Sequence, residues 1–300
     1  MHVVGMVLHP QRDSAEAVAA VLHWAERNRV QVLGVAEEIA RLNCAALAVT
    51  QTELAARSDL LVSLGGDGTM LRAMRLADRQ RAPVLGVNLG KLGFLAEVDV
   101  PDLPEALSAI DSRQYTVEPR LAVDAVIGGE VATAFNDVAV VRFPGESSAV
   151  VTVWAAGHRF VSYAADAIVV ATPTGSTAYS FSAGGPIVSP AVEALLVTPA
   201  APHSAYNRGV VISVSDSLVL EVLPSSGRLA VEVDGRVSAT IEPGDRIELL
   251  PRPGAAHVVR LGHTTFYERA RRKLRLTDSA EVPPDLPVPP VPFGPGDGLP

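Results

Sequence analysis

A Gly-Gly-Asp-Gly-Thr segment at residues 65–69 is the part of this sequence best suited to chemistry. It interrupts a continuous apolar run, and a helical pattern follows it. Glycines allow backbone N–H groups to approach a phosphate closely, and a helix that begins beside them adds the positive end of its dipole. The segment therefore predicts a strand, a tight turn and the start of a helix. The residues predicted to bind phosphate in this turn are Gly65, Gly66, Gly68 and Thr69.

A second polar segment, Thr-Pro-Thr-Gly-Ser-Thr-Ala-Tyr-Ser at residues 172–180, follows a run of strand-forming residues and leads to Gly184-Gly185-Pro186. Hydroxyl groups, small side chains and glycine turns suit a loop that donates hydrogen bonds to a polar ligand. An ordinary loop rich in serine and threonine is the other interpretation, and this segment taken alone favours neither.

Strand and helix patterns alternate in the first part of the chain. A helical pattern follows Asp13, which has the spacing of a capping box with Glu16. Such alternation is typical of a parallel sheet with helices on its faces, whose ligands bind at the carboxyl ends of the strands. Asp67 lies at such an end. Strands are predicted at Val3–Leu8, Val30–Val35, Leu60–Leu64 and Pro83–Val87, and helices at Glu37–Leu42 and Thr69–Ala77.

A change in the sequence pattern near residue 116 indicates a second, mainly β domain. From there to Leu261, short β-branched or alternating runs are separated by glycine turns. A helical pattern returns at Thr265, with Glu268 three residues later, and we expect this helix to pack back onto the first domain. The predicted parts are an α/β domain at 1–115, a β-sandwich-like domain at 116–263, the returning helix at 264–276 and a proline-rich, disordered extension at 277–300.

The composition is that of a soluble globular protein, with 48% hydrophobic and 19% charged residues among 300. A formal charge of −8 argues against a nucleic-acid or anionic-membrane partner, since such binding needs clustered Lys and Arg. One basic cluster is present on the short last helix, and we interpret it as a solvated face. It consists of Arg269, Arg271, Arg272, Lys273 and Arg275.

The single cysteine, Cys44, excludes an intrachain disulfide and a cysteine-based metal cluster, so nothing in the sequence points to an oxidising compartment. The first residues form a strand pattern without the charged, apolar and small-residue order of a signal peptide. No apolar run reaches membrane-spanning length. We therefore expect a cytoplasmic protein.

Taken together, the motifs resemble those of the NAD kinase family. The likeness runs through both predicted domains, and the motifs occur in the family's order. They are Gly-Gly-Asp-Gly-Thr at 65–69, Asn-Leu-Gly-x-Leu-Gly-Phe at 88–94, Asn136-Asp137, the hydroxyl-rich segment at 172–180, Gly184-Gly185-Pro186 and Asp234-Gly235.

The resemblance implies phosphorylation of the 2′-hydroxyl of the adenosine ribose of NAD, which gives NADP, with ATP or polyphosphate as donor. It also implies an α/β nucleotide-binding domain, a β-sandwich-like domain and a cleft between them. NAD and ATP would be the small-molecule partners of a homodimer or homotetramer.

In that family the aspartate of the glycine turn acts as general base towards the 2′-hydroxyl, and Asp67 holds this position. A carboxylate is a far weaker base than an alkoxide, so we expect Asp67 mainly to orient the hydroxyl while its proton leaves late. As an acid in the first turn of a helix, Asp67 also suits an N-terminal helix cap.

A carboxylate beside phosphate needs a positive charge close by. No lysine follows the glycines, and the Walker A pattern is absent from the sequence. We therefore predict that Mg²⁺ or another divalent metal enters with ATP, with no metal ligand assigned to the protein.

The resemblance assigns dinucleotide contacts to the second domain. Asn136 and Asp137 correspond to an asparagine-glutamate pair at the adenine and ribose, and the shorter Asp137 is predicted to act through water. An Asn-Asp pair is otherwise typical of a turn, and Tyr179 also suits a core aromatic. Asp166 corresponds to an acid at the nicotinamide end, in some members across a subunit interface. The other assigned residues are Thr174, Thr177, Ala178, Ser180, Phe181 and Ser182.

Three further side chains have two interpretations each. Phe94 suits either stacking on adenine or packing in the core. Arg72, one turn into the helix after the glycines, suits a phosphate ligand or a solvent-facing position. Arg236, where the family commonly has glutamine, suits a ligand phosphate or the closing of a hairpin at Asp234-Gly235.

Other protein classes share part of this pattern. Lipid kinases of the diacylglycerol and sphingosine type have the glycine turn before a β domain, but they and phosphofructokinase-like enzymes lack the segment at 172–180. A Rossmann oxidoreductase is disfavoured because the turn follows a later strand and lacks the final glycine of the fingerprint. A catalytically silent dinucleotide-binding regulator is the alternative that is not an enzyme.

Overall fold

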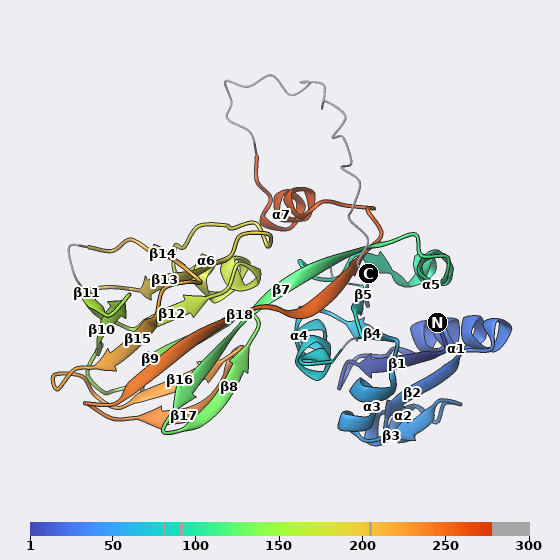
Figure 1. The fold of residues 1–300 in the computed structure, drawn as a ribbon, viewed down its shortest axis with the longest axis horizontal. Coiled ribbons are helices and arrows are strands. Elements are labelled where there is room, and N and C mark those ends of the chain that lie inside the picture. The colour runs from blue at the N-terminus through green and yellow to red at the C-terminus, as the bar shows by residue number, and fades with distance from the viewer. Residues whose placement is uncertain (81, 91–92, 204–205, 278–300) are drawn as a thin grey trace.

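The computed structural model describes residues 1–80, 82–90, 93–203 and 206–277. It consists of an α/β half, a β-rich half and a last helix that lies over the junction between them (Figure 1). Of the extension predicted at 277–300, residues 278–300 lie outside the described residues.

The first half is a parallel sheet with helices on both faces, as predicted. Its strands lie in the order β3-β2-β1-β4-β5, and a short β6 pairs with β5. The elements are β1 (Val3–Leu8), α1 (Ala15–Asn28), β2 (Gln31–Val35), α2 (Ala36–Leu42), β3 (Leu47–Val49), α3 (Gln51–Arg57), β4 (Leu60–Gly65), α4 (Asp67–Ala77), β5 (Val84–Asn88), β6 (Val98–Asp99), a 3-10 turn η1 (Val100–Asp102) and α5 (Leu103–Asp111).

Two apolar clusters hold this half together, one on each face of the sheet. Helices α1 and α5 cover one face, where Val21 and Leu107 are fully buried against strand residues such as Val62. Helices α3 and α4 cover the other face through Leu54 and Met74. The carboxyl ends of β4 and β5 are thereby fixed next to the start of α4.

The second half packs a six-stranded antiparallel sheet, in the order β14-β13-β12-β9-β16-β17, against antiparallel strands of the larger sheet, with one apolar core between them. This is the predicted sandwich-like arrangement. Its elements are β7 (Thr116–Ile127), β8 (Glu130–Ala134), β9 (Asp137–Arg142), β10 (Ala149–Ala155), β11 (His158–Ala165), β12 (Ala167–Ala171), a 3-10 turn η2 (Thr174–Thr177), α6 (Tyr179–Ser182), β13 (Ala194–Ala200), β14 (Val210–Ser213), β15 (Leu218–Val222), β16 (Leu229–Val233), β17 (Arg236–Ile241), β18 (Arg246–Arg260) and α7 (Phe266–Leu274).

The long strand β18 joins the two halves in one twelve-stranded sheet. It pairs with β15 and β7 in antiparallel fashion and meets β5 in parallel, where Val258 lies opposite Val84. Figure 1 shows β18 and β7 running from one half into the other. The start of β7 coincides with the domain boundary predicted at residue 115, and the boundaries themselves stay a prediction.

The helix starts were predicted with mixed success. The capping box expected at Asp13 and Glu16 is wrong: α1 is capped by Ser14 without a side-chain bond, and Asp13 instead accepts the N–H of Ala15. The box at Thr265 and Glu268 is confirmed and starts α7. No helix in the described ranges combines the length and apolar character that crossing a membrane requires.

Candidate active site

Asp67 is the first residue of α4, directly after the carboxyl end of β4. Among the hydrogen bonds of the described residues, its carboxylate makes no cap bond to α4. Instead, Oδ2 accepts the N–H of Phe94 at 3.1 Å, and Oδ1 accepts the N–H of Leu95 at 3.1 Å. A Cβ atom on Gly93 would overlap with Asp67 Oδ1, so this backbone can lie against the carboxylate only because residue 93 is glycine. The two family motifs at 65–69 and 88–94 thus meet at Asp67.

A lysine from the last helix reaches the same carboxylate. Lys273 Nζ lies 2.9 Å from Asp67 Oδ2 and 4.5 Å from the centre of the Phe94 ring. One turn earlier, Arg269 is only 2% exposed, donates to the carbonyls of Phe94 and Thr264, and so anchors α7. The interpretation of this basic cluster as a solvated face is therefore wrong for these two residues, because tertiary packing brings α7 onto the first half.

A pocket of about 330 Å³ opens beside the glycine turn, between the two halves. It brings together both predicted arginines and the predicted turn residues except Gly65, which is buried at the end of β4. It adds two residues that the sequence analysis missed, His9 and Arg12. The hydroxyl of Thr69 is buried and has no hydrogen-bond partner in the described structure. The lining residues are His9, Pro10, Arg12, Gly66, Asp67, Gly68, Thr69, Arg72 and Arg236.

Arg72 fits neither of its two simple interpretations. Its Nη2 donates to the carbonyl of Leu8 at 2.6 Å and lies 2.5 Å from Glu38 Oε1, while Glu38 Oε2 accepts the N–H of Leu8. Arg72 therefore ties α4 to the end of β1 and lines the pocket at the same time.

The surroundings of His9 disfavour its protonated form. Burial lowers its pKa, and the positive charges of Arg12, Arg41 and Arg72 lower it further. Its Nδ1 accepts the N–H groups of Gln11 and Arg12, at 3.1 and 2.9 Å, which orders the loop between β1 and α1. This loop places Arg12 next to Gly66.

On the other side, Asp234 organises the predicted Asn136-Asp137 pair. Its side chain is 1% exposed, and its Oδ1 accepts the N–H groups of Phe135, Asn136 and Asp137 at 3.1, 2.7 and 3.3 Å. Its Oδ2 lies 2.5 Å from Nη1 of Arg75 on α4. The predicted hairpin turn between β16 and β17 is confirmed, but this carboxylate, which links the two halves, was missed.

The Asp137 carboxyl is 4% exposed at the start of β9 and accepts the backbone N–H of Tyr179. Burial raises its pKa to about 7, and the nearby Asp234 and Glu232 carboxylates act in the same direction. This group therefore changes its charge near neutral pH.

The hydroxyl-rich segment is attached to the same loop. Thr172 donates its hydroxyl to the carbonyl of Phe135 at 2.5 Å, and its N–H to the carbonyl of Asn136 at 2.9 Å. At Gly175 any Cβ would overlap with the Asn136 carbonyl, so the two segments touch only because this residue is glycine. Buried Thr174 accepts a long hydrogen bond of 3.4 Å from Arg120.

The predicted residues at 177–182 differ in their exposure to solvent. Ser180 is fully buried and its hydroxyl bonds to Thr198 at 3.0 Å, which holds α6 against β13. Phe181 and Ser182 are exposed, whereas Thr177 and Ala178 are half-buried. Ser180 thus has a structural partner, while its neighbours on α6 face outward.

Asp166 lies at the opposite end of β12 from Thr172 and is partly exposed. Its Oδ1 is 2.5 Å from Nε of Arg142. Burial raises the pKa of the half-buried Tyr179, and the charges of Glu232, Asp137 and Asp166 raise it further. Asp166 thus acts electrostatically on Tyr179, and it is not among the residues that line the pocket beside the glycine turn.

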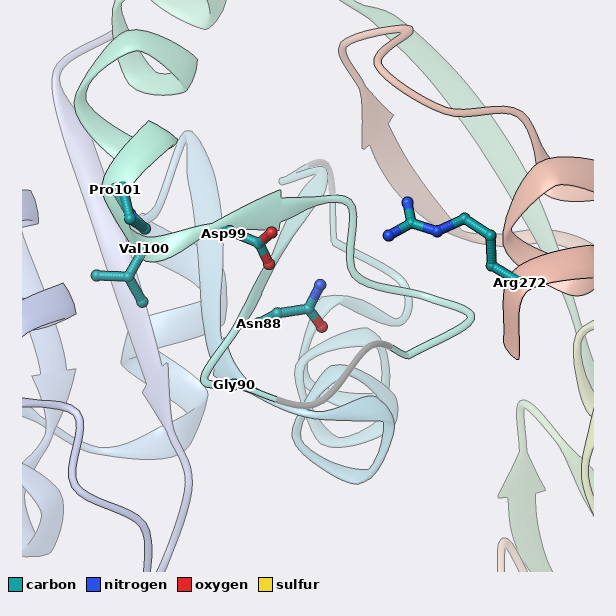
Figure 2. Close-up of a pocket in the computed structure, with 6 residues that line it drawn as sticks. All are labelled: Asn88, Gly90, Asp99, Val100, Pro101 and Arg272. Atoms are coloured by element: carbon teal, nitrogen blue, oxygen red, sulfur yellow. The ribbon is translucent and has the colours of Figure 1, made fainter. Parts of the chain in front are cut away.

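A second pocket, of about 420 Å³, lies between the ends of β5 and β6 and helix α7. Figure 2 shows Arg272 extending from α7 across this pocket towards the side where Asn88 and Asp99 lie. None of these three side chains was assigned a role in the site from the sequence, although Asn88 begins a family motif and Arg272 belongs to the basic cluster of the last helix.

Two family models match the chain, the ATP-NAD kinase N-terminal domain over residues 4–115 and the ATP-NAD kinase C-terminal domain over residues 135–261. The chain belongs to the NAD kinase family. NAD kinase 1 of Streptomyces avermitilis is 37% identical over 349 residues, covering 98% of this chain and 97% of that protein. The NAD kinase of Desulforamulus reducens is 38% identical over 283 residues, covering 92% and 98%.

Solved structures of NAD kinases share the fold. A yeast NADH kinase in complex with NADH superimposes with a TM-score of 0.84 at 27% identity, over 93% of this chain and 89% of that one. An NAD kinase from Archaeoglobus fulgidus in complex with ATP gives a TM-score of 0.71 at 25% identity, over 91% and 98%. The resemblance inferred from the motifs is thereby confirmed.

Proposed function

We propose that this NAD kinase transfers the terminal phosphoryl group of ATP to the 2′-hydroxyl of the adenosine ribose of NAD, at Asp67. One observation carries this proposal: the ion pair between Arg75 and Asp234. It joins the helix that starts at Asp67 to the loop that presents Asn136 and Asp137. The glycine turn and the loop that would bind the acceptor are thus held in a fixed relative position. Such positioning is most of what a protein contributes to phosphoryl transfer.

The phosphates of ATP would lie in the pocket beside the glycine turn. Arg12 and Arg236 line it from the two halves, and the start of α4 adds its positive dipole end. The hydroxyl of Thr69, which has no partner among the described residues, could donate a hydrogen bond to a phosphate oxygen there. These groups suit a polyanion, either the triphosphate of a nucleotide or a polyphosphate chain.

Mg²⁺, which we propose to enter with ATP, would be held by the phosphates. Among the described residues lining the pocket, Asp67 carries the one carboxylate, and it is already paired with Lys273. That donor set does not fit a protein-held metal, so no step proposed here depends on one. Mg²⁺ would neutralise the triphosphate when bound to it.

NAD would bind to the β-rich half. Asn136 and Asp137 face the adenosine in this proposal, and Tyr179 closes the site on the α6 side. Their backbone is fixed by Asp234 and Thr172, which supports a preformed acceptor site. The further residues proposed to contact NAD are Phe94, Thr174, Thr177, Ala178, Ser180, Phe181, Ser182 and Asp166.

Asp67 would orient the 2′-hydroxyl. Its carboxylate is fixed by two backbone N–H groups, from Phe94 and Leu95. A fixed acceptor can hold the hydroxyl in line with the phosphorus and take its proton as the bond to phosphorus forms.

Incubation of the purified protein with NAD, ATP and Mg²⁺, followed by a coupled NADP-specific dehydrogenase, tests the proposal. We expect NADP to accumulate. Absence of NADP with ATP, other nucleoside triphosphates and polyphosphate would contradict the proposal and favour a silent dinucleotide-binding protein. Phosphorylation of diacylglycerol or sphingosine in parallel reactions would favour a lipid kinase instead.

We also propose a cytoplasmic homodimer or homotetramer, on the basis of family membership. Large apolar side chains are exposed on strands at the edges of the two sheets, Phe160 on β11 and Val237 on β17, and such exposure is typical of subunit contacts. Light scattering behind size-exclusion chromatography measures the mass in solution; a monomer would contradict this part.

A further inference from the structure

We propose that Lys273 is a positioning residue of the kinase site: its ammonium fixes Asp67 so that one carboxylate position faces the acceptor hydroxyl. This inference rests on the proposed function. The sequence separation of the two residues is 206, and the contact of 2.9 Å exists only because α7 folds back onto the first half.

The hydrogen bonds of Asp67 leave little freedom for its carboxylate. A carboxylate has about four acceptor positions. Oδ2 accepts from Phe94 N–H and from Lys273, and Oδ1 accepts from Leu95 N–H. One position, on Oδ1, therefore remains for the 2′-hydroxyl, and loss of the lysine would free a second one on Oδ2.

The lysine is itself held in place from two sides. Arg269 and Lys273 lie one helical turn apart on α7 and therefore share a face of the helix. The buried Arg269 fixes this face to the Phe94 carbonyl, and the Lys273 ammonium lies over the Phe94 ring, a favourable cation–π contact. The side chain of Lys273 is 33% exposed and that of Asp67 is 27% exposed, so the pair is accessible to substrate.

Arg72, on the same helix as Asp67, does not pair with this carboxylate. Arg72 is engaged by Leu8 and Glu38, and among the contacts described for the chain, Asp67 has Lys273 as its one cationic partner. The cation paired with Asp67 thus comes from the last helix of the chain, since no lysine directly follows the glycines.

The test compares Lys273→Met with Arg272→Met. Methionine keeps the apolar stem over Phe94 and removes the charge. Arg272→Met is the control, because it removes the same charge from the preceding position of α7. Arg272 extends into the separate pocket of Figure 2. We expect Lys273→Met to lower kcat by about 10- to 100-fold with little change in KM for NAD, since misplacing a reacting group by about 1 Å has effects of this size. Arg272→Met should keep the wild-type kcat.

Chemical rescue separates positioning from a merely structural role. In Lys273→Ala the space left by the side chain is open to solvent, so methylammonium or ethylammonium should restore part of kcat. The same amines should do nothing for the wild type or for Asp67→Asn. Thermal unfolding of both lysine variants should stay close to that of the wild type.

The inference is overturned if both lysine variants keep kcat within about twofold of the wild type, or if their loss is confined to KM. A loss of kcat without amine rescue and with lowered thermal stability would also overturn it. If the wild-type protein itself makes no NADP, the proposed function fails, whereas an active wild type with an equally active Lys273→Met contradicts this inference alone.

Discussion

The two sides of the site carry opposite charge. On the α/β side, Arg12 and Arg72 surround the glycine turn, and Arg236 reaches it from the β-rich half. On the acceptor side, the charges of Glu232, Asp137 and Asp166 raise the pKa of Tyr179, and burial beside the Asp234 and Glu232 carboxylates raises the pKa of Asp137 to about 7. One side thus suits phosphates, and the other suits neutral hydroxyl groups that donate hydrogen bonds.

In the proposed arrangement this difference would separate the donor from the acceptor. The arginines beside the glycine turn would bind the phosphates of ATP, and the carboxylates of the acceptor side would accept hydrogen bonds from the ribose hydroxyls of NAD. The Arg75–Asp234 ion pair lies where the two sides meet. The following experiments test this division, beginning with the largest expected effect.

Asp67→Asn should remove most of the turnover, by at least about 100-fold, because the amide cannot take the proton of the 2′-hydroxyl. The fold and the affinity for NAD should be kept, since the acceptor loops do not depend on this carboxylate. Steady-state kinetics and NAD titration measure both. Turnover close to that of the wild type would remove Asp67 from its assigned role.

Asp234→Asn should weaken the contact that holds the two halves together, the ion pair with Arg75. The variant leaves Arg75 without its anionic partner and weakens the hydrogen bonds to the Asn136-Asp137 loop. We expect about 2–4 kcal/mol lower stability and a KM for NAD raised at least about 10-fold. Denaturant unfolding and kinetics are the measurements. Asp245→Asn is the control. Its carboxylate lies in an exposed turn and, in the part of the chain that the structure describes, accepts only the N–H of Glu242, so this variant should change KM little.

Arg12→Ala should affect only the donor side. Loss of one charge-assisted hydrogen bond to phosphate should raise KM for ATP by about 10-fold and leave KM for NAD unchanged. Arg27→Ala, near the other end of α1, removes the same charge away from the pocket and serves as control. An unchanged KM for ATP in Arg12→Ala would show that the phosphates bind elsewhere.

Asp137 should make stability depend on pH on the acceptor side. Burial raises its pKa in the folded protein from the usual 3.8 to about 7, so the folded state binds the extra proton between these values. Stability should therefore fall as pH rises through this window, by up to about 1.4 kcal/mol per pH unit from this group. Asp137→Asn should flatten the slope in denaturant unfolding at pH 5, 6 and 7; an unchanged slope would contradict the burial argument.

Local sequence patterns predicted much of the fold. Strand and helix periodicity predicted the two halves, and the Thr265-Glu268 spacing predicted the start of α7. The motifs that identified the family include glycines with a steric reason: Gly93 and Gly175 allow one backbone to touch another group. Such reasons act over short distances and are visible in the sequence.

The contacts missed from the sequence join residues far apart in the chain. Lys273 looked like part of a solvated helix, and Asp234 looked like an ordinary hairpin residue. Arg12 follows β1 in a segment without any motif. In each case the partner is decided by how β18 joins the two halves and how α7 returns to them, and no local spacing encodes that.

The most direct test of the division between the two sides is calorimetric titration of ATP and of NAD into the wild type, Arg12→Ala and Asn136→Ala. We predict that Arg12→Ala weakens ATP binding about 10-fold and NAD binding less than about 2-fold, with the reverse for Asn136→Ala. If both variants weaken both ligands alike, donor and acceptor do not occupy separate sides, and the proposed arrangement of the site is wrong.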